Sequence, residues 1–365
     1  MISAVLVSYR SASFLRRAAA SLRGDASAAG LPLEIVAVVN SGDPVEAKEA
    51  REVADTVVVP ERNLGYGGGL NAGIDRARGT TLVLSNPDVV FAPGAVLELT
   101  AALDGGGLRM CGPALFWDDG RTFFIPPSDE PTPVEFVRRA ISGRGDTRGL
   151  LFRRDLRRAL LQREGVLAGR TRPVRALSGA VLSISKATFQ RVGPFDEGFQ
   201  LYYEENDWQA RLRALRGELL HVGKAPVVHH FNQSARQEPK AAAWFAASES
   251  RYLKIHHGER GLRSRELAAM RRAPVDLPGL TPLPSGSTFE IPTGGPFAAL
   301  LSPSPLFRPF ALCVPAPGPW EVPADVREST SGETWYARIV DVSSGRPLAA
   351  FAVASAPVGP GGREP

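Results

Sequence analysis

Residues 56–88 read TVVVPERNLGYGGGLNAGIDRARGTTLVLSNPD, and this stretch decides the fold. A β-branched run at 56–59 is followed by a glycine-rich turn, a helix-like segment at 69–78 and a second apolar run at 80–84. The second run ends abruptly in Ser-Asn-Pro-Asp. Apolar strands that alternate with short helices predict a parallel sheet whose strands are buried on both faces.

The same alternation extends in both directions along the chain. The other strands expected in this part of the chain are 2–8, 33–39, 110–124, 176–184, 218–222 and 226–231. The other expected helices are 11–23, 44–54, 94–104, 186–192, 201–216 and 239–257. The pattern therefore predicts an α/β fold with a doubly wound, mixed but mainly parallel sheet.

The composition changes after Pro274, because 17 of the 31 prolines lie between residues 274 and 365. The β-type runs in this region are short, at 287–291, 309–314, 334–342 and 347–353. Short strands of this kind predict a small all-β, sandwich-like module, which is also a candidate surface for homo-oligomer formation. We expect a domain at 1–255 with an Arg-rich insertion at 126–175, a helical linker at 256–280 and the β module at 281–365.

Composition also limits the class of protein. The 365 residues are 44% hydrophobic and 22% charged, which excludes a mainly disordered chain. Two cysteines, Cys111 and Cys313, exclude a disulfide framework and a cysteine-based zinc site. The sequence contains no run of 18 apolar residues, so it predicts no membrane-spanning helix. The first residues, MISAVLVSYR, are typical of a core strand and not of a signal peptide. We expect a cytoplasmic protein.

The charge is distributed unevenly. The net charge of +5 is too small to indicate a nucleic-acid-binding protein. Between residues 138 and 175, however, twelve arginines face only three acidic residues. Solvated helix faces account for such a stretch, but the mixture in LLFRRDLRRALL is also typical of a helix at an anionic membrane surface. Peripheral contact with the inner face of the cell membrane through 138–175 is therefore an open alternative.

Five glycines stand between residues 65 and 73, a density that lets the backbone approach a polar ligand closely. The helix that follows offers N-terminal amides, which favour phosphate. A tight, closely packed turn explains the glycines equally well. A third reading is the dinucleotide fingerprint, because Gly67-x-Gly69-x-x-Ala72 matches it and Asp88 lies beyond, although the loop follows the third strand and not the first.

Asp88 lies in the segment Ser85-Asn86-Pro87-Asp88, which directly follows the strand at 80–84, at the edge where open α/β sheets bind their ligands. A carboxylate there suits Mg²⁺ or Mn²⁺, while a plain Asn-Pro-Asp turn is the structural alternative. His229 and His230 alternate along a later strand, so at most one of them faces a given site. His256 and His257 lie on a helical segment and are expected to face solvent.

Three acidic residues, Glu204, Glu205 and Asp207, open an amphipathic helix after two tyrosines. They compensate the helix dipole in the simplest interpretation. In the functional interpretation, aromatic surroundings and like-charged neighbours raise the pKa of one carboxylate, which then serves as a general base.

Taken in order, these segments resemble the family 2 glycosyltransferases with a GT-A fold, especially the bacterial rhamnosyltransferase-like branch. The resemblance covers about residues 2–255. It rests on VLVSYRSASFLRRAAASL, EIVAVVNSGD, NLGYGGGLNAGI, LSNPDVVF and SGAVLSISKATFQRVGPFDEGFQLYYEENDWQARLR. The third segment closely matches the family pattern N-x-G-[FY]-x-x-G-x-N-x-G, and the order of all five is far more specific than any single one.

The resemblance implies inverting transfer of a sugar, such as rhamnose or another deoxy or furanose sugar, from a TDP or UDP sugar. The implied acceptor is a hydroxyl of a glycan or of a polyprenyl-diphosphate-linked glycolipid, in the synthesis of cell-surface polysaccharide. A divalent cation, Mg²⁺ or Mn²⁺, is implied as well. The alternative from another class is a non-catalytic protein that binds nucleotide sugars or glycans.

The resemblance also implies roles for single residues. The nucleotide-sugar site would consist of Ser8, Tyr9, Asn40, Asn63, Gly65, Gly69, Asn71 and Asn86. Asp88 and His229 would hold the cation, and Glu205 would be the catalytic base, with Glu204 or Asp207 as alternatives. Two residues depart from the family: Val39 stands where Asp is frequent, which leaves uracil or thymine open, and Glu205 replaces the usual Asp but keeps the carboxylate.

Overall fold

The computed structural model describes residues 1–141, 145–230, 240–270, 281–283, 288–303, 310–329 and 334–354. The chain forms two compact units. The first consists of residues 1–115, 127–135 and 165–264, and the second of residues 116–126, 136–164 and 265–365. The expected boundaries near 255 and 281 stay a prediction, and residues 271–280 of the expected linker lie outside the described residues.

The helices, in chain order, are α1 (Ala12–Ala28), α2 (Pro44–Val53), α3 (Gly65–Ile74), α4 (Ala95–Ala101), α5 (Pro133–Ile141), α6 (Gly145–Leu167), α7 (Lys186–Val192), α8 (Glu204–Ala214), α9 (Ala241–Met270) and α10 (Ala324–Ser329). The strands of the first unit are β1 (Ile2–Ser8), β2 (Leu33–Val39), β3 (Thr56–Val58), β4 (Thr81–Ser85), β5 (Val89–Phe91), β6 (Arg109–Phe116), β8 (Thr171–Pro173), β9 (Val181–Ser185) and β10 (Glu218–His229). Those of the second unit are β7 (Phe124–Ile125), β11 (Thr281–Leu283), β12 (Phe289–Ile291), β13 (Phe297–Ser302), β14 (Ala311–Cys313), β15 (Gly318–Trp320), β16 (Thr334–Asp341) and β17 (Pro347–Ala354).

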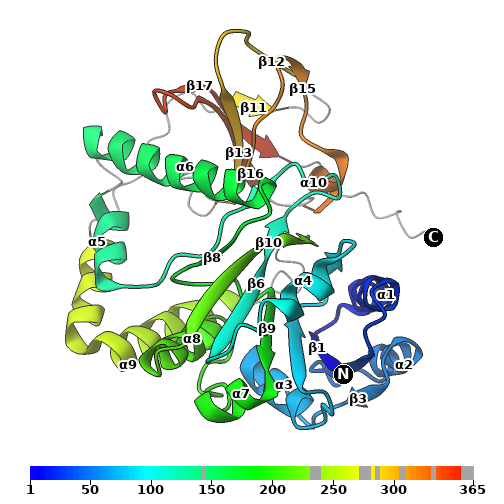
Figure 1. Cartoon of the computed structure of the whole chain (residues 1–365). Coiled ribbons are helices and arrows are strands. Elements are labelled where there is room, and N and C mark those ends of the chain that lie inside the picture. The colour runs from blue at the N-terminus through cyan, green and yellow to red at the C-terminus, as the bar shows by residue number, and fades with distance from the viewer. Residues whose placement is uncertain are drawn as a thin grey trace. The chain divides into compact units, whose positions relative to one another are not determined.

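The sheet of the first unit has the order β3-β2-β1-β4-β9-β6 (Figure 1). The pairings among β3, β2, β1 and β4 are parallel, as the alternation of apolar strands and helices predicted. Strand β9 then runs antiparallel to both β4 and β6, and β10 runs antiparallel to β5 and β8. The predicted fold class, a mixed α/β sheet with further strands toward the C-terminus, is confirmed.

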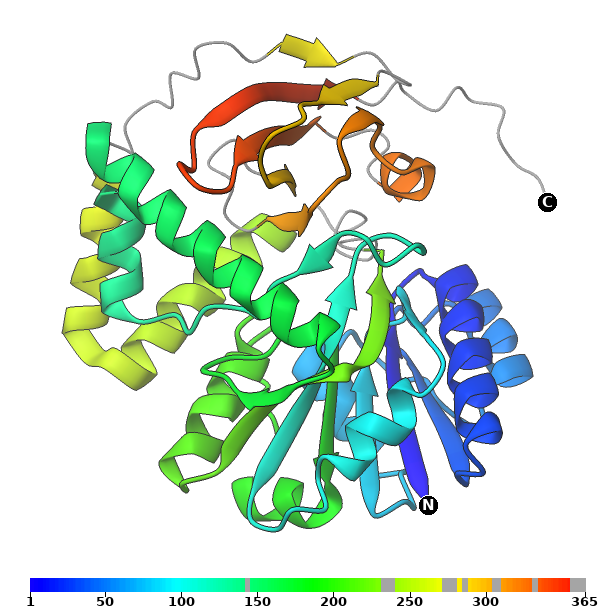
Figure 2. The same ribbon diagram turned by 45° about the horizontal axis from the view of Figure 1, so that its top comes forward.

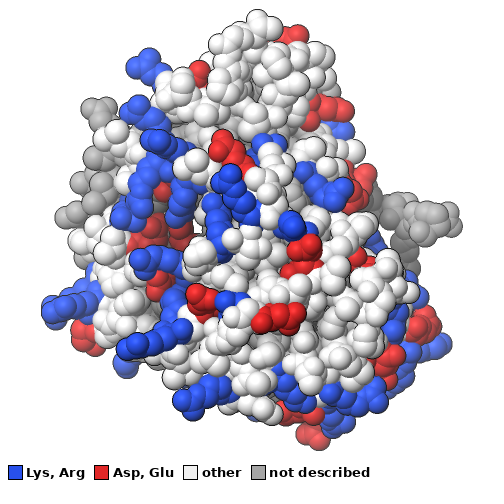
Figure 3. All heavy atoms as spheres, viewed as in Figure 1, with Lys and Arg blue, Asp and Glu red and all other residues white. Residues whose placement is uncertain are grey.

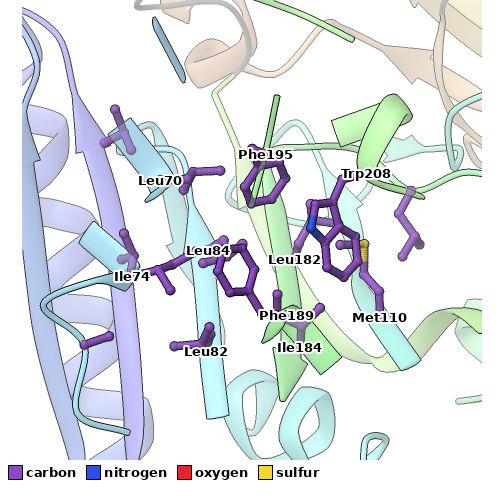
Figure 4. Packing of buried hydrophobic residues seen from close by; sticks show 14 of the residues in the cluster. Leu70, Ile74, Leu82, Leu84, Met110, Leu182, Ile184, Phe189, Phe195 and Trp208 are labelled. Atoms are coloured by element: carbon purple, nitrogen blue, oxygen red, sulfur yellow. The ribbon is translucent and has the colours of Figure 1, made fainter. Parts of the chain in front are cut away.

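Helices cover both faces of this sheet. On one face lie α3, α7 and α8, which bury an apolar cluster against the central strands. Figure 4 shows this cluster, to which the three helices contribute Leu70, Phe189 and Trp208. The opposite face carries α1 and α4, which contact each other and the strands beneath them. The sheet is therefore doubly wound.

Several predicted elements have different bounds in the structure. Helix α3 begins at Gly65 and not at residue 69, and α8 begins at Glu204 and not at residue 201. The expected strand at 110–124 is broken, because the Asp118 carboxylate accepts hydrogen bonds from the amides of Thr122 and Phe123 and closes a turn. Strand β10 is continuous where two strands were expected.

The second unit contains a sheet of order β11-β17-β16-β13-β14-β7, in which only the β11–β17 pairing is parallel. The small β12–β15 sheet packs on one face through Phe289, Phe297 and Trp320. Helix α6 lies on the other face (Figures 1 and 2). There Leu156 and Leu300 belong to one buried apolar cluster. A helix from the Arg-rich stretch thus completes the core of the C-terminal strands.

Helix α3 lies directly on strand β1, and its glycines make this close approach possible. A Cβ atom on Gly69 would come within 2.8 Å of Val7 Cγ1. A Cβ atom on Gly73 would overlap with Val5 and would lie 3.0 Å from Val38 Cγ2. These two glycines are therefore explained by packing against the sheet.

We expect Gly73→Ala to lower the free energy of unfolding by roughly 1–3 kcal/mol, because the new methyl group overfills this contact. Gly24→Ala is the matched control. Gly24 lies inside α1, and a methyl group added there would meet no atom within 4 Å, so alanine should stabilise the protein by about 0.5–1 kcal/mol. Thermal or denaturant unfolding measures both changes, and equal stability of the two variants would contradict the packing argument.

Candidate active site

The first amides of α3 already have acceptors within the protein. The N–H of Leu64 donates to Asn40 Oδ1 at 2.9 Å, that of Gly65 to Asn63 Oδ1 at 2.8 Å, and that of Tyr66 to the Gln200 carbonyl at 3.3 Å. The expectation that the glycine-rich turn offers phosphate its N-terminal amides is therefore wrong for these three groups.

Asn71 fastens α3 to the segment that leads into α8. Its Nδ2 donates to the Phe195 carbonyl at 3.0 Å and to Glu197 Oε1 at 3.1 Å, while its Oδ1 accepts from the Phe195 amide at 2.9 Å. The Asn40 amide similarly bridges β2 to Asn63 and Gly65. These asparagines shape the site, and their predicted contact with a nucleotide sugar stays a prediction.

The dinucleotide-binding alternative is wrong. In that fingerprint the glycines form the turn between a strand and a helix. Here Gly67 and Gly69 lie inside α3, where a Cβ on Gly67 would meet Phe195 Cβ at 3.2 Å and Glu204 Cβ at 3.3 Å. Side chains of the protein cover both positions, so the glycines serve close packing between α3, β1 and the start of α8.

Sequence reasoning missed Glu46, a buried carboxylate at the ends of β1 and β2. It accepts hydrogen bonds from the Ser8 and Ser41 hydroxyls at 2.5 Å each, and from the amides of Arg10 and Ser11. Ser8 is thus engaged in holding this edge together. Nothing in the local pattern of α2 marks Glu46, because all of these partners except Ser41 lie 35 or more residues away in sequence.

Asp88 and His229 lie side by side at the end of the parallel strands. Asp88 stands just before β5, whose antiparallel pairing with β10 places His229 opposite Val89. Both side chains are buried, and His229 Nε2 lies 3.4 Å from Asp88 Oδ1. The His230 amide donates to the Asp88 carbonyl at 2.9 Å, and the Asn86 amide donates to the Ala180 carbonyl at 2.8 Å. The structure therefore brings the two predicted cation ligands together.

A strained turn precedes the acidic residues of α8. Tyr202 and Tyr203 have φ values of 66° and 71°, the left-handed region that non-glycine residues seldom occupy. The buried Tyr203 ring packs against Phe245 and Tyr252 of α9, and its hydroxyl donates to Glu249 Oε1 at 2.9 Å. Helix α9 thus holds the turn in a conformation that such residues avoid unless their surroundings impose it.

The carboxyl groups of Glu204 and Glu205 follow this turn. A Cβ on Gly179 would lie 3.3 Å from Glu205 Cδ, so the Glu205 side chain rests on bare backbone one residue before Ala180. Burial raises the pKa of Glu205 to about 7. Burial, reinforced by the charge of Glu205, raises the pKa of Glu204 well above its ordinary value. A carboxylate that ionises near neutral pH has the proton affinity of a general base.

Asp207 is held differently from the other two acids. His256 Nε2 lies 2.8 Å from Asp207 Oδ1, and Arg211 donates to Oδ2 at 2.9 Å. Burial by itself would raise the pKa of Asp207, but these hydrogen bonds and the Arg211 charge lower it. The expectation that His256 faces solvent is wrong, because its ring also packs on Tyr252 at 4.7 Å between centroids.

Two tyrosines connect the acidic pair with Asp88. Tyr66 donates its hydroxyl to the Gly179 carbonyl at 3.1 Å. Burial and the charges of Glu204, Glu205 and Asp88 raise the pKa of Tyr66 well above its ordinary value, and the same causes raise the pKa of Tyr202 to about 12. The pKa values of both tyrosines are therefore raised by the carboxylates of α8 and by that of Asp88, between β4 and β5.

Comparisons with known proteins bear on this arrangement. Residues 3–175 match the family described as Glycosyl transferase family 2. The chain is 28% identical over 195 residues to the low-salt glycan biosynthesis hexosyltransferase Agl10 of Haloferax volcanii. It is 29% identical over 203 residues to an N-acetylglucosaminyl-diphospho-decaprenol L-rhamnosyltransferase of Mycobacterium tuberculosis. Each match covers 52% of this chain, and the chain spans 54% and 63% of the two relatives.

The similarity of this chain to solved structures is weaker. The crystal structure of GalNAc-T7 with UDP, GalNAc and Mn²⁺ aligns with 74% of this chain and 54% of its own, at 15% identity and a TM-score of 0.47. The mannosyltransferase PcManGT from Pyrobaculum calidifontis, in complex with GDP-Man and Mn²⁺, aligns with 74% of this chain and 73% of its own, at 13% identity and a TM-score of 0.44.

The raised pKa of Glu205 predicts a pH-dependent stability difference for Glu205→Gln. Between about 4.5 and 7 the folded protein binds this proton more strongly than the unfolded chain, so the stability that Glu205 contributes falls as the pH rises through this window. The variant lacks this titration. Its melting temperature should therefore match that of the unmodified protein near pH 5 and exceed it by a few degrees at pH 8.

Differential scanning calorimetry between pH 5 and pH 8 measures this difference. Glu259→Gln is the control, because it removes an exposed carboxylate from α9 and should keep the pH dependence of the unmodified protein. A difference between Glu205→Gln and the unmodified protein that stays constant across this range would show that Glu205 ionises normally.

Proposed function

We propose that the protein transfers a sugar from a nucleotide-diphosphate sugar to a hydroxyl acceptor, and the match of residues 3–175 to the family described as Glycosyl transferase family 2 supports this proposal. The donor is a TDP or UDP sugar, with rhamnose or another deoxy or furanose sugar as the group transferred. The acceptor is a glycan or a polyprenyl-diphosphate-linked glycolipid of cell-surface polysaccharide synthesis. The names of the two curated relatives, a hexosyltransferase and a rhamnosyltransferase, support this choice.

The observation that carries the proposal is the Glu204–Glu205 pair. Two adjacent carboxyl groups, of a buried Glu204 and a half-buried Glu205, lie at the start of a helix, after a strained turn against which α9 packs. Removing such a pair from water costs stability. Acidic residues that only compensate the helix macrodipole need neither removal from water nor a strained turn before them. A general base that must accept a proton near neutral pH accounts for both features.

In the proposed reaction Glu205 accepts the proton of the acceptor hydroxyl, whose oxygen attacks the anomeric carbon from the side opposite the leaving nucleoside diphosphate. The configuration at that carbon is therefore inverted. Burial and the charge of Glu205 raise the pKa of Glu204 as well, so a second negative charge beside an ionised Glu205 is disfavoured. Asp207, paired with His256 and Arg211, stays ionised and anchors α8, which leaves Glu205 as the base.

Asp88 and His229 fit a divalent cation. A carboxylate and an imidazole are both ligands that Mn²⁺ accepts, and Mg²⁺ takes the carboxylate with substrate phosphates. Within the described residues no three acidic, histidine or cysteine side chains gather as a metal site, so diphosphate oxygens would complete the coordination. A cation held there would supply Lewis-acid stabilisation of the charge on the departing diphosphate.

The proposal is tested by transfer to a water-soluble acceptor that carries N-acetylglucosaminyl diphosphate on a short prenyl chain. We expect TDP or UDP to raise the melting temperature, and Mn²⁺ to raise it further only when the nucleotide is present. Glu205→Gln should abolish transfer but keep this nucleotide effect. The rate of the unmodified protein should fall about tenfold per pH unit below pH 7, as Glu205 becomes protonated.

Each outcome separates the proposal from its alternatives. Stabilisation by nucleotide sugars without turnover of any of them would favour the non-catalytic binding protein. Full turnover by Glu205→Gln would refute the assignment of the base. The matched variant Glu259→Gln, on the exposed surface of α9, should retain both transfer and its pH profile.

The exposed face of α6 supports contact with an anionic membrane surface. Leu150, Arg154, Arg157 and Leu161 recur at helical spacing and are all exposed, on the side opposite the buried Leu156. Figure 3 shows basic side chains gathered where Figure 1 places this helix. No helix of the described ranges is long and apolar enough to cross a bilayer. Exposed leucines among arginines are typical of a helix that lies in the membrane interface.

We expect the protein to bind phosphatidylglycerol vesicles with an affinity that falls steeply with salt. Arg154→Gln with Arg157→Gln should weaken binding roughly 30-fold, at about 1 kcal/mol for each arginine near the surface. The control pair Arg260→Gln with Arg263→Gln removes the same charge from exposed positions of α9 and should have a much smaller effect. Equal losses in both pairs, or no vesicle binding at all, would contradict a specific role for α6.

A further inference from the structure

The first two turns of α9 carry no charge. Residues 241–247 read AAAWFAA, in a chain of which 22% of residues are charged. Ala242, Ala243, Phe245 and Ala247 are exposed, and the Phe245 ring keeps 40% of its surface open to solvent. An exposed aromatic ring among alanines leaves an apolar surface of this kind open to a ligand or partner.

This surface adjoins the acidic pair through two ring contacts. The Tyr202 and Phe245 rings meet edge to face at 5.3 Å between centroids, and Tyr203 meets Phe245 at 5.4 Å. Tyr203 in turn directly precedes Glu204 in the chain. The strained turn therefore serves two purposes: it starts α8 with the acidic pair, and it sets the Tyr202 ring against Phe245.

The chemistry of the proposed reaction, on which this inference rests, limits what can lie here. The hydroxyl that Glu205 deprotonates must come within hydrogen-bond reach of its carboxylate, so the group carrying that hydroxyl must lie close to Tyr202. Sugar rings present faces of C–H groups, and the negative face of an aromatic ring attracts their partial positive charge. A sugar ring therefore matches both the apolar rings and the adjacent carboxylate.

We propose that Tyr202 and Phe245 form a platform on which the acceptor's sugar ring stacks, with its reacting hydroxyl directed at Glu205. The platform recognises a sugar unit and not the lipid or diphosphate that carries it. It lies beside the acidic pair and is built from the turn before α8 and the first turns of α9. Neither element belongs to the residues 3–175 that match the family.

The test uses the full-length protein and the prenyl-linked N-acetylglucosaminyl diphosphate introduced above. Phe245→Ala and Phe245→Leu should each raise the KM for this acceptor roughly 2- to 12-fold, the range expected for loss of one aromatic contact. Phe245→Trp, which keeps a ring, should retain the original KM. Ile255→Ala, at another exposed apolar position of α9, is the matched control and should leave KM unchanged.

Saturation-transfer NMR identifies which part of the acceptor contacts the protein. We expect transfer to the sugar ring protons, and its loss in Phe245→Ala. Transfer to the prenyl protons alone, an unchanged KM in Phe245→Leu, or no transfer to the sugar would each overturn the platform. Consumption of the nucleotide sugar by the unmodified protein tests the proposed function separately, so failure of the platform is distinguished from failure of the proposed function.

Discussion

Hydrogen bonds that join helix α3 to residues 195–200 are the constraint on which the candidate site depends. Asn71 binds the backbone of Phe195 in both directions, and the Tyr66 amide donates to the Gln200 carbonyl. They fix the segment before α8, more than 120 residues away in sequence, against the glycine-rich helix. Because α3 also lies directly on β1, the acidic pair is held at the strand edge where Asp88 stands. Rigid support of this kind is what positions catalytic groups with useful precision.

Backbone strain and the desolvation of carboxyl groups both destabilise the candidate site. Two consecutive tyrosines at positive φ cost on the order of 1–3 kcal/mol each, and the buried carboxyl group of Glu204 with the half-buried one of Glu205 adds a desolvation cost. Burial of the Tyr203 ring against α9 and its hydrogen bond to Glu249 offset part of this. The His256–Asp207 pair fastens the same two helices one turn further along. Helix α9 therefore supports the turn before α8, and in our proposals it thereby positions the reacting carboxylate and presents Phe245 to the acceptor.

The sequence predicts those features that local pattern determines. Continuous apolar strands indicated the parallel half of the sheet, and Asp88 was placed at its ligand edge because it follows β4 directly. The positive φ values of Tyr202 and Tyr203 could not be predicted, because they depend on tertiary contacts such as the packing of Tyr203 on Phe245 of α9. Helix α6 shows the same limit: its pattern indicates a buried face but not that Leu156 packs on strands more than 140 residues later. The glycines predicted a phosphate-binding turn. In the structure they let α3 pack closely on β1. The first amides of this helix donate to asparagine side chains and to the Gln200 carbonyl.

In the proposed mechanism Asp88 and Glu205 act on the same bound donor. The most direct measurement is a crystal structure of the protein with Mn²⁺ and an uncleaved nucleotide sugar. We predict that the cation binds Asp88 and His229, that the diphosphate lies against it, and that the Glu205 carboxylate faces the anomeric carbon of the sugar. A donor bound elsewhere, or one whose anomeric carbon faces away from Glu205, would contradict the account.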